Sequence, residues 1–172
     1  IGKVAMLKSV AASYEKSKQY AEAGEWYKKI LNVKKTPTKT DLYNAANSYY
    51  RIGQFAQSAD LYTLYTQKFP DDAFGYYMVG KSFWGIDTVM KYGLANNSFI
   101  KAIEVGELYP DKSKIIPQLM GSYKYLFAYS VNVLKNKELA LSYADKALVI
   151  DPNDAEIKAN REMIAPLTLK PD

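Results

Sequence analysis

Apolar side chains recur at spacings of three and four residues along most of the chain, which predicts a series of amphipathic helices. The pattern is clearest in residues 39–70, where Leu42, Ala45, Ala46 and Tyr49 form one apolar stripe. A second stripe begins just after a glycine and ends at a proline. Glycine favours the left-handed backbone that ends a helix, and proline cannot extend the helix before it. The segment therefore predicts two antiparallel helices, neither of which can bury its apolar face alone.

This segment resembles a tetratricopeptide repeat (TPR), a unit of about 34 residues that folds as a pair of helices. The positions that carry the resemblance are Leu42, Ala45, Ala46, Tyr49, Gly53, Phe55, Tyr62 and Pro70. Ser58 and Tyr65 stand where alanine is usual in the family. We expect the larger of the two, Tyr65, to push the paired helices slightly apart or to point out of the pair.

The resemblance implies an all-α fold, a single TPR domain over residues 1–172 that forms a right-handed superhelix of antiparallel helix pairs with a C-terminal capping helix. The four repeats are expected at about 4–37, 38–72, 73–112 and 113–152, and the capping helix at about 154–165. Thr38 and Asp41 have the spacing of a capping box at the start of the second repeat. The fourth repeat is expected to open with a long helix that carries Pro117 in its first turn.

The spacing of small residues becomes irregular in the third and fourth repeats. Ala95 comes three residues later than the family pattern requires, and Ala128 falls 48 residues after Gly80. We expect helices longer by one to two turns to hold the extra residues, including a long second helix with Gly93 and Gly106 as close-packing points. Lengthened repeats of this kind are similar to those of bacterial TPR proteins, many of which are exported. The resemblance favours the bacterial cell envelope or periplasm over the cytoplasm.

The composition excludes several classes of chemistry. The chain of 172 residues has no cysteine and no histidine, so disulfides, thiol catalysis, zinc–thiolate sites and Ser-His-Asp or Cys-His centres are impossible within it. No glycine-rich phosphate loop is present. Carboxylates such as Glu104, Glu107 and Asp111 are expected on helix surfaces, where carboxylates are usually solvated. We therefore expect neither an enzyme nor a cofactor or metal site.

The net charge of +5 is spread along the chain, with no run of five or six basic residues. The simplest interpretation is a solvated basic surface, and attraction to an acidic partner, nucleic acid or anionic lipid is the alternative. No apolar run is long enough to cross a membrane. Because the chain begins at Ile1 rather than at methionine, we expect a fragment, with any signal peptide or lipid anchor outside it.

In the TPR family, the first helix of each pair lines a concave groove that binds a partner. The peptide-binding positions that this resemblance implies are Tyr43, Asn44, Asn47, Tyr50 and Arg51 in the second repeat, Phe74, Tyr77, Met78 and Lys81 in the third, and Tyr125 and Tyr129 in the fourth. Trp84 is a further groove position, next to the irregular turn. Asparagine amides can hydrogen-bond a peptide backbone, and aromatic side chains are frequent interface anchors. The alternative for each ring is packing between neighbouring repeats.

We therefore interpret the chain as a non-enzymatic scaffold that binds a protein or peptide partner. Chaperone C-termini are excluded as the ligand, because Ala12, Phe74 and Met78 replace three of the five polar residues of the carboxylate clamp, although Lys8 and Asn44 match the other two. RNA binding through the tyrosines ranks lower, since no base-reading code is present. A glycan-binding module and a purely architectural role within a larger chain remain open.

Overall fold

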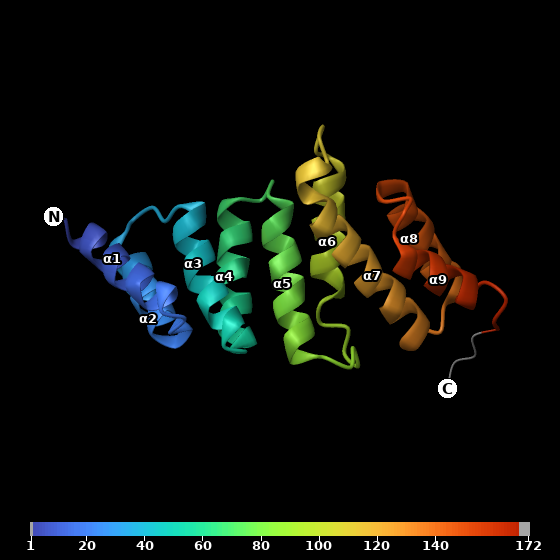
Figure 1. The fold of residues 1–172 in the computed structure, drawn as a ribbon, viewed down its shortest axis with the longest axis horizontal. Coiled ribbons are helices and arrows are strands. Elements are labelled where there is room, and N and C mark those ends of the chain that lie inside the picture. Colours follow the sequence, from blue (N-terminus) through green and yellow to red (C-terminus); the bar gives the residue numbers. More distant parts are fainter. Residues whose placement is uncertain (1, 169–172) are drawn as a thin grey trace.

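The computed structural model describes residues 2–168 and contains, within them, nine α-helices and one short 3-10 helix, with no strand. The bounds are α1 Lys3–Lys16, α2 Tyr20–Val33, α3 Lys39–Arg51, α4 Phe55–Lys68, α5 Ala73–Ile86, α6 Asn96–Glu107, the 3-10 helix Ser113–Ile115, α7 Ile116–Asn132, α8 Lys137–Ile150 and α9 Ala155–Ile164. Each helix packs against the next in the chain, and together they form a single row from one terminus to the other (Figure 1). The all-α prediction is confirmed, with α1–α8 in four consecutive pairs and α9 packed on α8.

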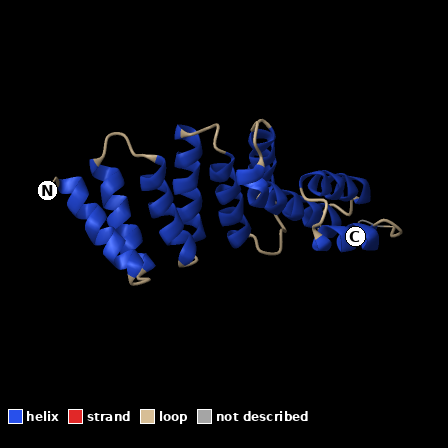
Figure 2. Cartoon of the chain, turned by 45° about the horizontal axis from the view of Figure 1, so that its top comes forward, coloured by secondary structure: helices blue, strands red, loops and turns tan. Residues whose placement is uncertain are grey.

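The row of helices also twists along its length. Figure 2 shows the helices nearest the N-terminus standing upright in the view, whereas those nearest the C-terminus lie almost across it. Such a progressive turn is what the small rotation between successive repeats produces in a solenoid. No helix among residues 2–168 is both long enough and apolar enough to span a membrane.

Local capping signals start the helices where the sequence predicts. Thr38 and Asp41 form the expected capping box: the Thr38 hydroxyl accepts a bond from the Asp41 N–H at 3.3 Å, and the Asp41 carboxylate accepts one from the Thr38 N–H at 2.9 Å. Gly53, with φ +74°, follows the end of α3 in the left-handed conformation. Pro117 lies in the first turn of α7, which at 17 residues is the longest helix of the described chain, as expected.

Small residues allow neighbouring helices to approach closely. A Cβ atom on Gly80 of α5 would lie 2.9 Å from the ring of Phe99 in α6, and one on Gly106 would lie 2.8 Å from Leu119 in α7. The expectation for Gly106 as a close-packing point is therefore confirmed. Tyr65 follows the second of the two expected alternatives and points out of its own helix pair: its ring is only 4% exposed and packs against Gly75 of α5, whose missing side chain leaves room for it.

The predicted long second helix of the third repeat is wrong. The helix α6 has only 12 residues, against 14 in each of α2, α4 and α8, and the additional residues lie in the loop 87–95 and in α7. The buried carboxylate of Asp87 accepts a hydrogen bond from the Tyr92 N–H at 2.9 Å, and Met90 and Gly93 adopt φ values of 60° and 61°. This turn prevents α5 from running into α6, so Gly93 lies in a loop and not in a helix.

Candidate functional site

The residues predicted to bind a partner lie on α3, α5 and α7, the first helices of their pairs. We call their surface the first-helix face; it consists of Tyr43, Asn44, Asn47, Tyr50, Arg51, Phe74, Tyr77, Lys81, Trp84 and Tyr129. Direct contacts between side chains of neighbouring first helices show that these positions are adjacent in space although they are distant in sequence.

Rings and one ammonium group join α3 to α5. The ring centroids of Tyr43 and Phe74 are 5.8 Å apart. The Lys81 ammonium nitrogen lies 5.1 Å from the centroid of the Tyr50 ring and 5.8 Å from that of Tyr77. Such cation–π contacts hold a lysine side chain in place without neutralising its charge. The surface between these two helices is therefore both aromatic and cationic.

The aromatic contacts continue from α5 to α7. The ring centroids of Trp84 and Tyr125 are 5.4 Å apart, and the rings of Tyr125 and Tyr129 are stacked at 6.4 Å with only 8° between their planes. Trp84 is 39% exposed, while Tyr129 is half-buried. The first-helix face thus spans three helix pairs, and its contact from α5 to α7 is made through the ring of Tyr125.

Accessibility divides the predicted site residues into three groups. Tyr43, Arg51 and Trp84 are exposed; Asn44, Asn47, Tyr50, Phe74, Tyr77, Lys81 and Tyr129 are half-buried; Met78 and Tyr125 are buried. Met78 is 7% exposed and packs in the core around α4 and α5, and Tyr125 is 2% exposed and packs against Phe99 of α6. Burial, with a smaller contribution from the Asp87 carboxylate, raises the pKa of Tyr125 to about 12. These two side chains belong to the core rather than to the first-helix face.

A buried carboxylate fixes the joint between α1 and α3. Asp41 is 3% exposed and forms ion pairs with Lys8 of α1, at 2.8 Å, and with Lys34 of the loop before α3. Burial raises the pKa of the Asp41 carboxyl, but the hydrogen bonds from Lys34, Lys8 and Thr38 outweigh this effect and hold the pKa well below its ordinary value. Asp41 is therefore ionised at neutral pH, and its charge is neutralised locally.

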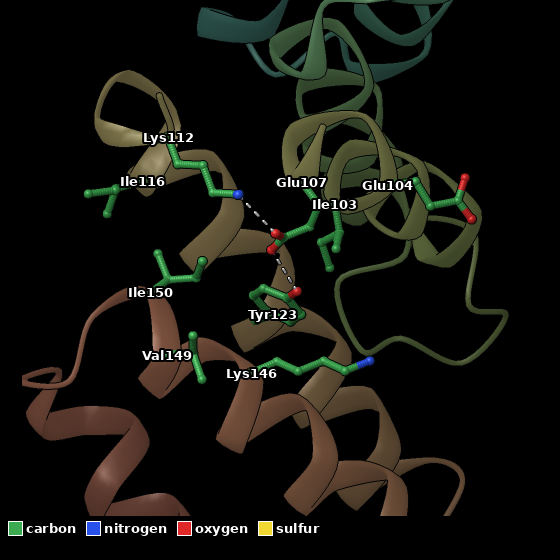
Figure 3. Close-up of a pocket in the computed structure, with 9 residues that line it drawn as sticks. All are labelled: Ile103, Glu104, Glu107, Lys112, Ile116, Tyr123, Lys146, Val149 and Ile150. Carbon is green, nitrogen blue, oxygen red and sulfur yellow. Dashed lines mark hydrogen bonds and ion pairs between the residues drawn. The ribbon is translucent and has the colours of Figure 1, made fainter. Parts of the chain in front are cut away.

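A hollow of about 680 Å³ lies among α6, α7 and α8 (Figure 3). Its lining residues are Ile103, Glu104, Glu107, Lys112, Ile116, Tyr123, Lys146, Val149 and Ile150. Lys112 and Tyr123 both point at Glu107, with the Lys112 nitrogen 3.5 Å from one carboxylate oxygen and the Tyr123 hydroxyl 3.3 Å from the other (Figure 3). The Glu107 carboxylate thus accepts both an ion pair and a hydrogen bond from side chains that line the same hollow.

Sequence patterns do not reveal this hollow, since its residues come from three helices and a loop that only the tertiary arrangement brings together. The other carboxylates considered as catalytic candidates are also engaged: Glu104 pairs with Lys101 at 3.0 Å, and Asp111 accepts a hydrogen bond from the Ser113 N–H. Among residues 2–168, no group of three or more acidic side chains is arranged to hold a metal ion.

Comparison with known proteins identifies the fold. No family model matches the chain, and no curated protein matches it. A solved structure of the C-terminal part of a TPR repeat-containing protein from Cytophaga hutchinsonii superposes with a TM-score of 0.82 over 92% of the chain. The chain has the TPR fold. It is 18% identical to the Cytophaga protein and spans 60% of the length of that structure.

A second similar structure is that of a TPR repeats protein from Bacteroides fragilis, which is 15% identical to the present chain. The match has a TM-score of 0.46 and covers 96% of the present chain and 99% of the Bacteroides chain. The fold assignment rests on the Cytophaga structure, and at 18% identity that likeness establishes the fold alone. The TPR fold in turn accounts for the alternation of first and second helices that creates the first-helix face.

Proposed function

We propose that this TPR chain is a non-enzymatic scaffold that binds an extended or helical segment of a protein partner on the first-helix face. TPR arrays are in general interaction scaffolds, because their stacked repeats expose long surfaces of fixed shape. The assignment of the binding site to the first-helix face is supported by the pair of asparagine amides beside an exposed ring on α3. Tyr43 is 36% exposed, and Asn44 and Asn47 are half-buried next to it.

The two asparagine side chains are available to a ligand. Within residues 2–168, the amide groups of Asn44 and Asn47 form no hydrogen bond with another residue. A side-chain amide can donate to a peptide carbonyl and accept from a peptide N–H at the same time. The helical backbone fixes where these amides lie, so less conformational entropy is lost when they bind than on a loop.

The proposal can be tested by selecting ligands from a library of random 12-residue peptides with the purified protein and measuring their affinity by fluorescence anisotropy. We expect Tyr43→Ala combined with Asn47→Ala to weaken the selected peptides about tenfold or more, since an anchoring aromatic residue commonly contributes 2 kcal/mol. The far-UV circular dichroism should remain unchanged, because neither side chain belongs to the core.

The matched control combines Tyr92→Ala with Asn97→Ala, an exposed tyrosine in the loop 87–95 and an exposed asparagine at the start of α6. This variant should bind the selected peptides as tightly as the unsubstituted protein. A library that yields no binding peptide, or peptides that bind the Tyr43 and Asn47 double variant without loss, would refute the assignment of the first-helix face.

A further inference from the structure

The first helices carry a net positive charge because they contain few acidic residues. Together α1, α3, α5 and α7 carry seven lysine or arginine residues and two acidic residues, a net charge of +5. The second helices α2, α4, α6 and α8 carry six basic and seven acidic residues, a net charge of −1. Because first and second helices alternate along the chain, this separation is invisible as a charge run in the sequence.

The two acidic residues of the first helices lie on α1 and α3, and both are engaged within the array rather than near Arg51 and Lys81. Asp41 is buried and already paired with two lysines. Glu15 of α1 accepts a hydrogen bond from the hydroxyl of Tyr27 in α2, within its own helix pair. The helices α5 and α7 contain no acidic residue at all.

Two cations of the first-helix face are held by aromatic rings instead of carboxylates. The guanidinium carbon of Arg51 lies 4.9 Å from the centroid of the Tyr20 ring, and its Nη1 donates a hydrogen bond to the Tyr20 hydroxyl at 3.1 Å. The Lys81 ammonium lies over Tyr50 and Tyr77. Within residues 2–168, no carboxylate oxygen comes within 4 Å of either cation. Both side chains are thus restrained in position with their charge still unmatched.

We propose that the partner segment on the first-helix face is acidic, and that its carboxylates pair with Arg51 beside the ring of Tyr20 and with Lys81 beside the ring of Tyr50. This inference rests on the proposed function and adds the chemistry of the ligand. A carboxylate accepts charge-assisted hydrogen bonds from both cations, and an arginine can bind it in a bidentate manner. Cations that the protein has already restrained lose less entropy when such a pair forms.

An acidic peptide fits this surface better than a nucleic acid. Binding of single strands uses a cationic groove along the backbone together with ring faces on which successive bases stack. Here the uncommitted cations are few, and the rings of Tyr50, Phe74 and Tyr77 are half-buried, with their neighbours packed against them at steep angles. A few carboxylates alternating with apolar side chains match such a surface.

The test uses the peptides selected from the random library. We expect them to be enriched in aspartate and glutamate, and to bind about tenfold more weakly when those residues are replaced by asparagine and glutamine. Arg51→Gln with Lys81→Gln should weaken the original peptides by a similar factor, since each charge pair at a surface changes a binding constant by up to about fivefold and two pairs are lost together. Binding should also weaken as the salt concentration rises.

The matched control is Lys28→Gln with Lys68→Gln, which removes the same charge from exposed positions on α2 and α4. It should leave peptide affinity unchanged. Peptides that depend on Tyr43 and Asn47, but show no acidic enrichment and bind the Arg51 and Lys81 variant normally, would overturn this inference and leave the proposed function standing. Tighter binding of a single-stranded 12-nucleotide RNA than of any selected peptide would also overturn it, in favour of a nucleic-acid surface.

Discussion

Gly75→Ala should destabilise the protein when Tyr65 is present and stabilise it when Tyr65 is alanine. A Cβ atom at residue 75 would lie 2.7 Å from Cδ1 of the Tyr65 ring and 3.0 Å from Cγ2 of Thr66. The ring has no room to withdraw, because its hydroxyl donates a 2.6 Å hydrogen bond to Asp72 and its face packs against Phe69 at 5.2 Å. The tyrosine in place of the usual alanine and the glycine on the next helix are thus complementary.

The magnitudes follow from two opposing effects of the added methyl group. Crowding in a packed core costs about 1–3 kcal/mol, whereas alanine is favoured over glycine in a helix by up to about 1 kcal/mol. Gly75→Ala should therefore lower the free energy of unfolding by about 1 kcal/mol in the native background. Tyr65→Ala alone should cost about 3–5 kcal/mol, as other buried aromatic truncations do. In that background the closest contact is gone and only the Thr66 methyl group remains near the added Cβ, at 3.0 Å, so Gly75→Ala should raise the free energy of unfolding.

Urea unfolding of the four proteins, followed by far-UV circular dichroism, completes the double-mutant cycle. The expected coupling between the two positions is about 1–3 kcal/mol, equal to the crowding term. An equal effect of Gly75→Ala in both backgrounds, or a gain of stability in the native background, would show that Tyr65 and Gly75 do not constrain one another.

Two further substitutions test the packing around the face. Asp41→Asn should cost about 2 kcal/mol at pH 7, less than for a fully buried pair because the lysines it leaves unpaired can reach water. The folded state holds the pKa of Asp41 below its ordinary value, so the stability that the Asp41 carboxylate contributes is present above about pH 4 and is lost at lower pH. The urea midpoints of the native protein and of Asp41→Asn should therefore converge as the pH falls. A difference between the two midpoints that stays constant with pH would contradict this. Gly93→Ala should lower the melting temperature more than Gly53→Ala. Both need a left-handed φ, but only at residue 93 would the added Cβ meet another side chain, 2.7 Å from the Tyr129 hydroxyl, so equal shifts would argue against this contact.

The features of the fold that the sequence predicts correctly are those decided by local interactions. The capping box of Thr38 and Asp41 is encoded within four residues, and Pro117 restricts where α7 can begin. The length of α6 could not be read in the same way. It depends on the turn that Asp87 and Met90 form, and Met90 adopts its left-handed conformation while packed in a core with residues of α6 and α7.

The exposure of individual rings was beyond prediction for a related reason. Sequence spacing places Tyr43, Tyr77 and Tyr125 at equivalent positions of successive first helices, yet Tyr43 is exposed and Tyr125 is buried. Tyr77 packs so closely on Gly121 of α7 that a Cβ there would lie 2.8 Å from the ring. Which residue of the next repeat approaches a given ring depends on how the helix pairs stack, and the irregular third repeat changes that stacking.

The charge of the first-helix face is not explained by the requirements of folding. Some exposed charges of the chain are matched with partners, as in the pairs of Lys101 with Glu104 at 3.0 Å and of Lys39 with Asp72 at 2.8 Å, whereas Arg51 and Lys81 are restrained by rings without a carboxylate. Exposed ion pairs contribute at most about 1 kcal/mol each, so their absence around Arg51 and Lys81 carries little cost, but it also brings no gain in stability. Small and apolar residues make the contacts where helices cross, so helix packing does not require a basic residue at position 51 or 81. An unmatched, ring-restrained pair of cations beside uncommitted amides is therefore best accounted for by an acidic ligand that completes the pairing when it binds.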